Sequence, residues 1–229
     1  MQGGIRGIFV TIGEAMTFYK EHFWAVLVFS LSVLLPLDIF LLIIKQLSIL
    51  LPGLDNLYYV LVPVVFAVIQ LPFILISVMF IKDEPFEIRE IYSMFFGRIS
   101  NAYIASLFFA LLMYLLTMIS KSLGIVGFFL AFSIPYLVVL KEYDLFTNIK
   151  KSTGLGIQKC VQMLAFFCCS ILLYWTINSA VSAGIGFLIK ETVPELLFLF
   201  LKLLIDMLLV PFGVYILTKS YSNWLTKGQ

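Results

Sequence analysis

Charged side chains are scarce in this chain of 229 residues. Lys, Arg, Asp and Glu together make up 12% of the sequence and hydrophobic residues 62%, whereas soluble globular domains average about 25% charged and about 45–50% apolar residues. A water-soluble core cannot hide so large an apolar share, so the composition excludes an ordinary soluble domain. The formal net charge of +2 is also too small to indicate a nucleic-acid partner.

Residues that carry catalysis or bind metals are scarce as well. His22 is the only histidine, and the three cysteines, Cys160, Cys168 and Cys169, have no second cluster at metal-ligand spacing. The sequence contains no glycine-rich phosphate loop, no nucleophile elbow and no zinc-binding histidine pair. We therefore predict no catalytic residue, no metal site and no cofactor, and we expect His22 to be an ordinary residue of the membrane interface.

What the chain has instead is six long apolar runs. They are Phe23 to Ile44, Leu57 to Ile81, Ala102 to Ile119, Leu123 to Leu140, Val161 to Ile189 and Leu196 to Leu217. Each is near or above the roughly 18 apolar residues that cross a hydrocarbon core about 30 Å thick. The sequence predicts an all-α membrane protein with six transmembrane helices, which form a single membrane domain over residues 1–229. The first run is longer than the roughly 7–15 apolar residues of a secretory signal, so we expect it to be retained.

Basic residues are concentrated on alternate connections. Eleven Lys and Arg residues lie in the N-terminal segment, the second and fourth connections and the C-terminal segment, against one lysine in each of the other three connections. Cytoplasmic segments carry an excess of Lys and Arg, which predicts that the N- and C-termini are both cytoplasmic. This arrangement requires an even number of crossings, and six runs satisfy it.

Three of the basic segments also show helical periodicity. Apolar residues at helical spacing over about 5–22, 85–98 and 144–159 indicate amphipathic helices. Such helices either lie in the cytoplasmic interface, with the apolar face toward the acyl chains, or pack on the inner face of the protein itself. Each precedes a pair of apolar runs, which suggests a threefold internal repeat whose copies share one direction across the membrane.

Four residues form a candidate intramembrane polar cluster. Ionisable groups near the bilayer centre cost about 2.5–3.5 kcal/mol by insertion scales, yet Asp38 lies in the first run and Lys202 and Asp206 lie in the sixth. Asp38 and Lys202 are both about 9 Å from the outer end of their runs, at 1.5 Å per residue. We therefore expect Lys202 to pair with Asp38, with Asp206 one turn deeper on the same face. Gln70, in the second run, is the fourth member.

This charged pair has more than one interpretation. It is a structural ion pair that fixes the orientation of two helices, or it is part of a substrate or proton pathway. A third arrangement extends Lys202 to the outer surface while Asp38 faces water.

The stretch from Ile134 to Ser152 reads IPYLVVLKEYDLFTNIKKS. A proline-containing apolar segment ends there in an acidic turn and is followed by a basic segment that contains a serine. This stretch resembles the YciC-like family of uncharacterised bacterial inner-membrane proteins and the related membrane domain that is fused to some glycerophosphodiester phosphodiesterases. The resemblance implies a multi-pass protein of the cytoplasmic membrane with no agreed biochemical activity.

These observations favour a non-enzymatic membrane protein that serves as a scaffold or accessory partner for envelope proteins or lipids. The alternative is a small transporter or channel subunit with a polar path through Asp38, Lys202 and Asp206. An intramembrane lipid enzyme is the third reading, and no converging set of acid, base and metal ligands in the sequence supports it. The expected partners are the lipid bilayer and either another membrane protein or a second copy of this chain.

Overall fold

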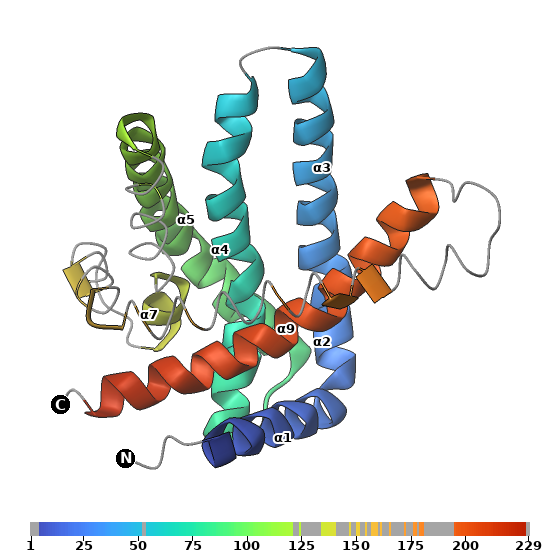
Figure 1. Cartoon of the computed structure of the whole chain (residues 1–229). Coiled ribbons are helices and arrows are strands. Elements are labelled where there is room, and N and C mark those ends of the chain that lie inside the picture. Colours follow the sequence, from blue (N-terminus) through green and yellow to red (C-terminus); the bar gives the residue numbers. More distant parts are fainter. Residues whose placement is uncertain are drawn as a thin grey trace.

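The computed structural model describes residues 5–51, 54–120, 124, 134–140 and 195–227, together with short pieces between 147 and 180. Every element in this part of the chain is a helix (Figure 1). Four segments are long and apolar enough to cross a membrane, and they are Phe23–Leu50, Leu54–Ile81, Ile88–Ile119 and Phe200–Trp224. The described chain is thus all-helical, with helices suited to a lipid bilayer.

The N-terminal helices form a corner followed by a hairpin. α1 (Ile5–Glu21) ends at a turn, and α2 (Phe23–Phe29) continues through a π-helical turn, η1 (Ser30–Leu34), into α3 (Leu35–Leu50). α4 (Leu54–Ile81) then returns alongside α3 in the opposite direction (Figure 1). The first apolar segment therefore extends beyond its predicted end and includes all of α3.

Pro36 accounts for the π-helical turn. Proline has no N–H, and its ring clashes with the carbonyl four residues earlier, which here is that of Ser32. The helix widens at this point, and the N–H of Leu35 donates to the carbonyl of Ser30, five residues back. The wider turn lets the helix continue past the proline, and it leaves the Ser30 side chain buried against α9.

α4 is the central helix of the described part. In its most apolar segment 72% of the residues are buried, compared with 22–28% in the other three long segments. It contacts α3, α5 (Ile88–Ile119), α7 (Ile134–Leu140) and α9 (Glu195–Lys227). Most of its side chains between Val64 and Ser77 are buried. A helix that is apolar on all sides is stable in such a central position.

One predicted surface helix is the beginning of a longer helix. The sequence predicts a separate amphipathic helix over 85–98 and a span that starts at Ala102, whereas α5 runs without interruption from Ile88 to Ile119. No proline lies between Ile88 and Ala102, and Gly97 lies in open surroundings that impose no break. Pro85 belongs to the extended connection before the helix. The prediction is corrected accordingly, because nothing in this sequence ends the helix.

Two other predicted spans, 123–140 and 161–189, and the predicted surface helix over 144–159 lie largely outside the described residues. The sixth predicted span, 196–217, lies within α9, which crosses the other helices obliquely (Figure 1). The start of α1 and the end of α9 lie on the same side of the molecule, opposite the end of α3 and the start of α4 (Figure 1). The six crossings and the threefold repeat stay predictions.

Candidate functional site

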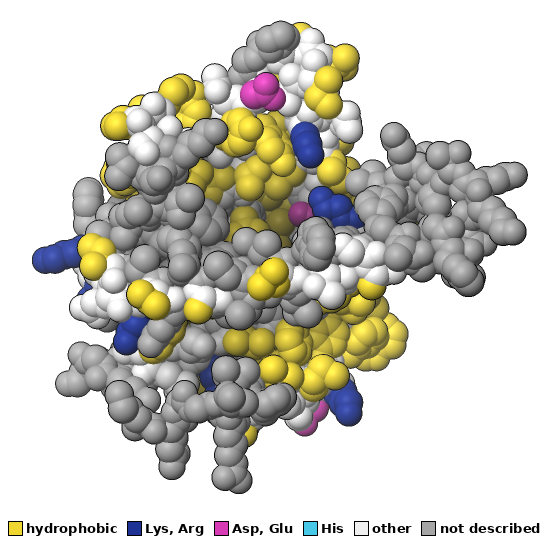
Figure 2. Space-filling view, in the orientation of Figure 1, with side chains coloured by type: hydrophobic (Ala, Val, Ile, Leu, Met, Phe, Trp, Pro, Cys, Tyr) yellow, Lys and Arg dark blue, Asp and Glu magenta, His cyan; other side chains and the backbone are white. Residues whose placement is uncertain are grey.

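The three ionisable residues of the predicted polar cluster lie in one region, where α3 contacts α9. Asp38, in the first turn of α3, interacts electrostatically with Asp206 and less strongly with Lys202. Figure 2 shows acidic and basic side chains at the edge of a hollow above α9. No ion pair joins Asp38 to Lys202 within the part of the chain that the structure describes. Since α9 crosses α3 obliquely, equal depth along the two helices does not bring two residues into contact.

Gln70 belongs to a different site. Its side chain is buried in the middle of α4, where Oε1 accepts a hydrogen bond of 2.7 Å from the hydroxyl of Tyr136 in α7. Its Nε2 donates to the carbonyl of Phe66 at 3.1 Å. The ring of Tyr136 stacks on that of Tyr221 in α9, with 4.5 Å between the ring centroids. Gln70 therefore helps to pack α4, α7 and α9 together and is not part of the cluster around Asp38.

A backbone carbonyl on α9 forms a polar contact that the sequence patterns did not predict. Pro211 has no N–H, so the carbonyl of Met207, four residues earlier, loses its helical donor. The hydroxyl of Tyr19 in α1 donates to this carbonyl at 3.2 Å, and the hydroxyl of Ser30 in η1 donates at 3.5 Å. Burial raises the pKa of Tyr19 to about 12, so its hydroxyl remains a donor at neutral pH. The signal in the sequence is the proline within an apolar run, which frees the carbonyl four positions before it.

An aromatic cluster holds α1 against the end of α4 and the C-terminal half of α9. Phe18 is fully buried and stacks on Tyr215 of α9 with 4.7 Å between the ring centroids. The Phe18 ring also meets Phe80 of α4 edge-on at 5.5 Å. His22, at the turn between α1 and α2, lies 5.4 Å from Phe80 and 5.0 Å from Phe86. The periodic pattern of α1 predicted an apolar face, and the structure shows which rings this face covers.

α1 has both a packed face and an exposed apolar face. Ala15 and Phe18 are fully buried, whereas the side chains of Val10 and Met16 are more than half exposed. Two arrangements were predicted for this helix, packing on the protein or lying in the membrane interface. The structure shows the first arrangement for one face and leaves the other face available for the second.

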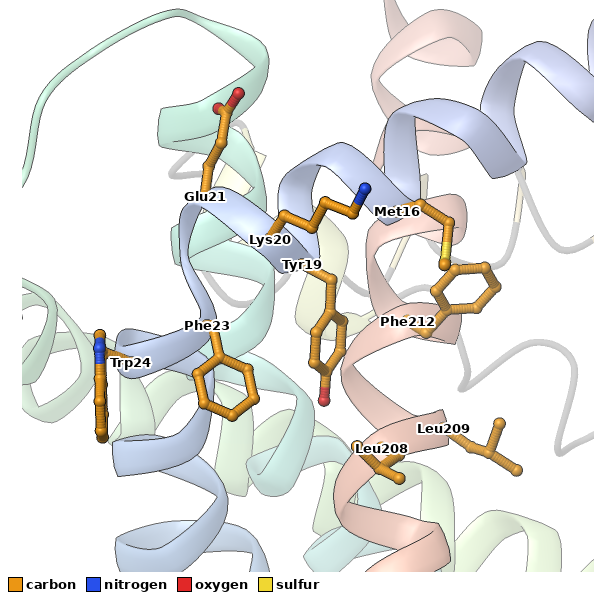
Figure 3. A pocket seen from close by; sticks show the side chains of 9 residues that line it. All are labelled: Met16, Tyr19, Lys20, Glu21, Phe23, Trp24, Leu208, Leu209 and Phe212. Carbon is orange, nitrogen blue, oxygen red and sulfur yellow. The ribbon is translucent and has the colours of Figure 1, made fainter.

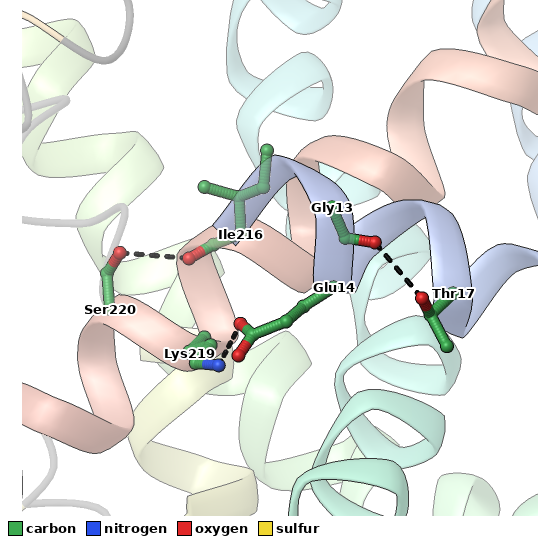
Figure 4. A network of polar contacts seen from close by, with 6 residues as sticks. All are labelled: Gly13, Glu14, Thr17, Ile216, Lys219 and Ser220. Carbon is green, nitrogen blue, oxygen red and sulfur yellow. Dashed lines mark hydrogen bonds and ion pairs between the residues drawn. The ribbon is translucent and has the colours of Figure 1, made fainter. Parts of the chain in front are cut away.

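An ion pair adds to the attachment of α1. Glu14 of α1 pairs with Lys219 of α9 (Figure 4). This ion pair is the polar contact that Figure 4 shows between the two helices. The hydroxyls of Thr17 and Ser220 donate instead to carbonyls of their own helices. Both charged side chains stay partly exposed, and exposed ion pairs contribute only about 0–1 kcal/mol. The aromatic cluster and the Met207 carbonyl therefore provide most of the attachment.

We expect protonation of His22 to loosen this junction. Burial among the rings lowers the pKa of His22 below its usual value of 6.5, although the neighbouring Glu21 opposes the shift. The unfolded chain then takes up the proton more readily than the folded chain. The contribution to stability is therefore complete above pH 6.5 and is lost as the pH falls through the lowered folded-state pKa.

Unfolding of the wild type and of His22→Phe in the same detergent, at about pH 7.5 and about pH 5.5, checks this expectation. The wild type is expected to lose more stability on acidification than His22→Phe. Equal losses in the two proteins would contradict the role of the imidazole.

A groove of about 700 Å³ opens beside the junction, between the end of α1, the start of α2 and the middle of α9 (Figure 3). Its lining is mainly apolar and consists of Met16, Tyr19, Lys20, Glu21, Phe23, Trp24, Leu208, Leu209 and Phe212. The side chain of Lys20 extends over the groove toward Met16, whereas that of Glu21 points away from it (Figure 3). The groove is thus shaped for an apolar ligand and carries a cation at its rim.

Within the described residues, no group of three or more His, Cys, Asp or Glu side chains is placed to hold a metal ion. Asp38 and Asp206 supply two carboxylates, and Lys202 near them is a cation that competes with a metal for the site. Comparison of the chain with protein-family models, curated proteins and solved structures found no match.

Proposed function

We propose that this protein is a non-enzymatic scaffold or accessory protein of a bacterial cytoplasmic membrane. It crosses the membrane six times with both termini in the cytoplasm, and it is related to the YciC-like family. The long apolar helices support the membrane location, and the alternation of basic connections supports the orientation. The stretch from Ile134 to Ser152 supports the family relation.

The arrangement of α1 is the observation that carries this proposal. Aromatic stacking, hydrogen bonds to a freed carbonyl and an ion pair hold one face of the helix on α9. Outside this packed face, the side chains of Val10 and Ile12 are 56% and 39% exposed, one on each flank of the helix. An amphipathic helix whose apolar side chains face outward from a fixed position is suited to binding a partner. A scaffold requires such a surface, whereas an enzyme requires converging catalytic groups.

Affinity purification of the full-length protein from native membranes tests the proposal. We expect a second membrane protein, or a second copy of this chain, to be recovered at constant stoichiometry. Val10→Ser/Ile12→Ser is expected to reduce that recovery about tenfold, because burial of the two side chains contributes about 1.5 kcal/mol or more. Tyr59→Ser, at a position that is 62% exposed near the start of α4, is the control and keeps the partner. Recovery of the protein alone, or unchanged recovery with Val10→Ser/Ile12→Ser, argues against a scaffold.

A second function is supported by the gathering of Asp38, Lys202 and Asp206 within apolar helices. Such groups line the pathways of transporters and channels. Ion or substrate flux into liposomes that contain the purified protein tests this alternative. Flux that disappears in Asp206→Asn and survives in Arg89→Ala, at an exposed position at the start of α5, favours a transporter or channel subunit over a scaffold.

A further inference from the structure

The groove between α1, α2 and α9 exposes large apolar side chains. Trp24 is 72% exposed, Leu208 56% and Phe23 43%, and Figure 2 shows a hydrophobic patch over α2, between α9 and α1. The volume of about 700 Å³ lies within the range of about 300–1,000 Å³ that is typical of small-molecule sites. The groove also begins where the first membrane-spanning segment begins, at Phe23. A ligand with a long apolar chain is therefore the best match to its walls.

The charged side chains at the rim indicate the charge of the polar head group of the ligand. Lys20 extends over the groove, and Glu21 points away from it (Figure 3). Glu14, one further carboxylate of α1, is already paired with Lys219. No ion pair involves Lys20 within the described residues. The hydroxyl of Tyr19 is occupied by the Met207 carbonyl, so the uncommitted polar group that extends over the groove is the ammonium group of Lys20.

The depth of these groups matches the layers of a membrane leaflet. Lys20 lies three positions before Phe23, the start of the first apolar segment, and Trp24 lies four positions after Lys20. Tryptophan favours the head-group level, and lysines near the membrane surface attract anionic lipids. Phe23, Leu208 and Phe212 line the groove beside them, and their apolar side chains suit contact with an acyl chain.

We propose that this groove binds an anionic phospholipid of the leaflet on the α1 side. Lys20 holds the phosphate and the anionic head group, and one acyl chain lies along the apolar wall of α2 and α9. The site requires only that the chain is embedded in a membrane, and it stands independently of the scaffold role. The two tests change different residues of α1, Lys20 for the lipid site and Val10 with Ile12 for the partner.

Fluorescence of Trp24 reports directly on the groove. Trp175→Phe/Trp224→Phe leaves Trp24 as the single tryptophan. This protein is reconstituted in phosphatidylcholine bilayers that contain brominated phosphatidylglycerol or, in a parallel series, brominated phosphatidylcholine. Half-maximal quenching is expected at an about fivefold lower mole fraction of the brominated anionic lipid, which is the contribution of one lysine at the surface. Mass spectrometry of lipids that remain bound to the wild type gives the same ratio without tryptophan replacement.

Lysine variants decide between a specific site and general contact with lipid. Lys20→Gln is expected to remove the fivefold preference, and Lys20→Glu to turn it into discrimination against the anionic lipid. Lys45→Gln makes the same change of charge at an exposed position in the last two turns of α3, far from the groove along the chain. This variant is expected to keep the preference. Equal quenching by the two brominated lipids in the wild-type background, or an unchanged preference in Lys20→Gln, would overturn the proposal.

Discussion

Phe18→Ala is expected to detach α1 from the rest of the protein and to lower the free energy of unfolding by about 3–5 kcal/mol, the cost of removing a fully buried phenylalanine. Phe18 has no exposed surface and contacts three other rings, those of Tyr215, Phe80 and His22. Alanine removes all three contacts, and the surrounding helices cannot close the space without moving. The effect is large because the other links between α1 and α9, an ion pair and a hydrogen bond, are weaker.

Titration of the protein in mixed micelles with sodium dodecyl sulfate, followed by circular dichroism, measures the change. Hydrogen exchange of the α1 amides shows whether the loss begins there, as expected. Met16→Ala is the matched control, because Met16 lies on the same helix and is 54% exposed, so its change is expected to stay within about 0.5 kcal/mol. Equal unfolding curves for Phe18→Ala and Met16→Ala would show that the aromatic cluster does not hold the helix.

Tyr19→Phe/Ser30→Ala is expected to cost about 1–3 kcal/mol, the penalty for a buried polar group without a partner. The two hydroxyls donate to the Met207 carbonyl, which has no helical donor because Pro211 follows four residues later. The free energy of unfolding in the same micelles is the measurement.

Pro211→Ala separates this explanation from a simple loss of packing. Alanine restores an N–H that donates to the Met207 carbonyl, so Tyr19→Phe/Ser30→Ala is expected to cost less in the Pro211→Ala background than in the wild type. Thr218→Ala is the control, because the buried hydroxyl of Thr218 donates to the carbonyl of Val214, which also accepts the ordinary helical hydrogen bond. An equal cost of the double change with and without Pro211 would refute the role of the freed carbonyl.

Some features of the junction were predictable and others were not. The periodicity of the first 22 residues predicts an amphipathic helix, and α1 ends at Glu21, where this pattern ends. The same periodicity does not say which helix receives the buried face, because α9 is almost 200 positions away along the chain. Pro211 is visible in the sequence, but the identity of the two hydroxyls that replace its missing N–H depends on how α1 and η1 approach α9.

The predicted polar cluster shows that counting residues along single helices does not predict contacts between helices. Equal distances from the ends of two apolar runs predict a contact between Asp38 and Lys202 only if the helices run side by side. α9 crosses obliquely (Figure 1), so Asp38 instead lies under the stronger influence of Asp206. Gln70 was grouped with these residues because it is polar and within a span, yet its rotation on α4 directs it to Tyr136.

The sequence by itself determined that this protein is made of helices suited to a bilayer. Length and hydrophobicity are properties of each segment alone, and a backbone surrounded by lipid must satisfy its hydrogen bonds within that segment. The tertiary structure alone decided which side chains meet, at the Met207 carbonyl, in the aromatic cluster and around Asp38. Those contacts depend on the crossing and rotation of the helices, which are set by the packing of all neighbours together.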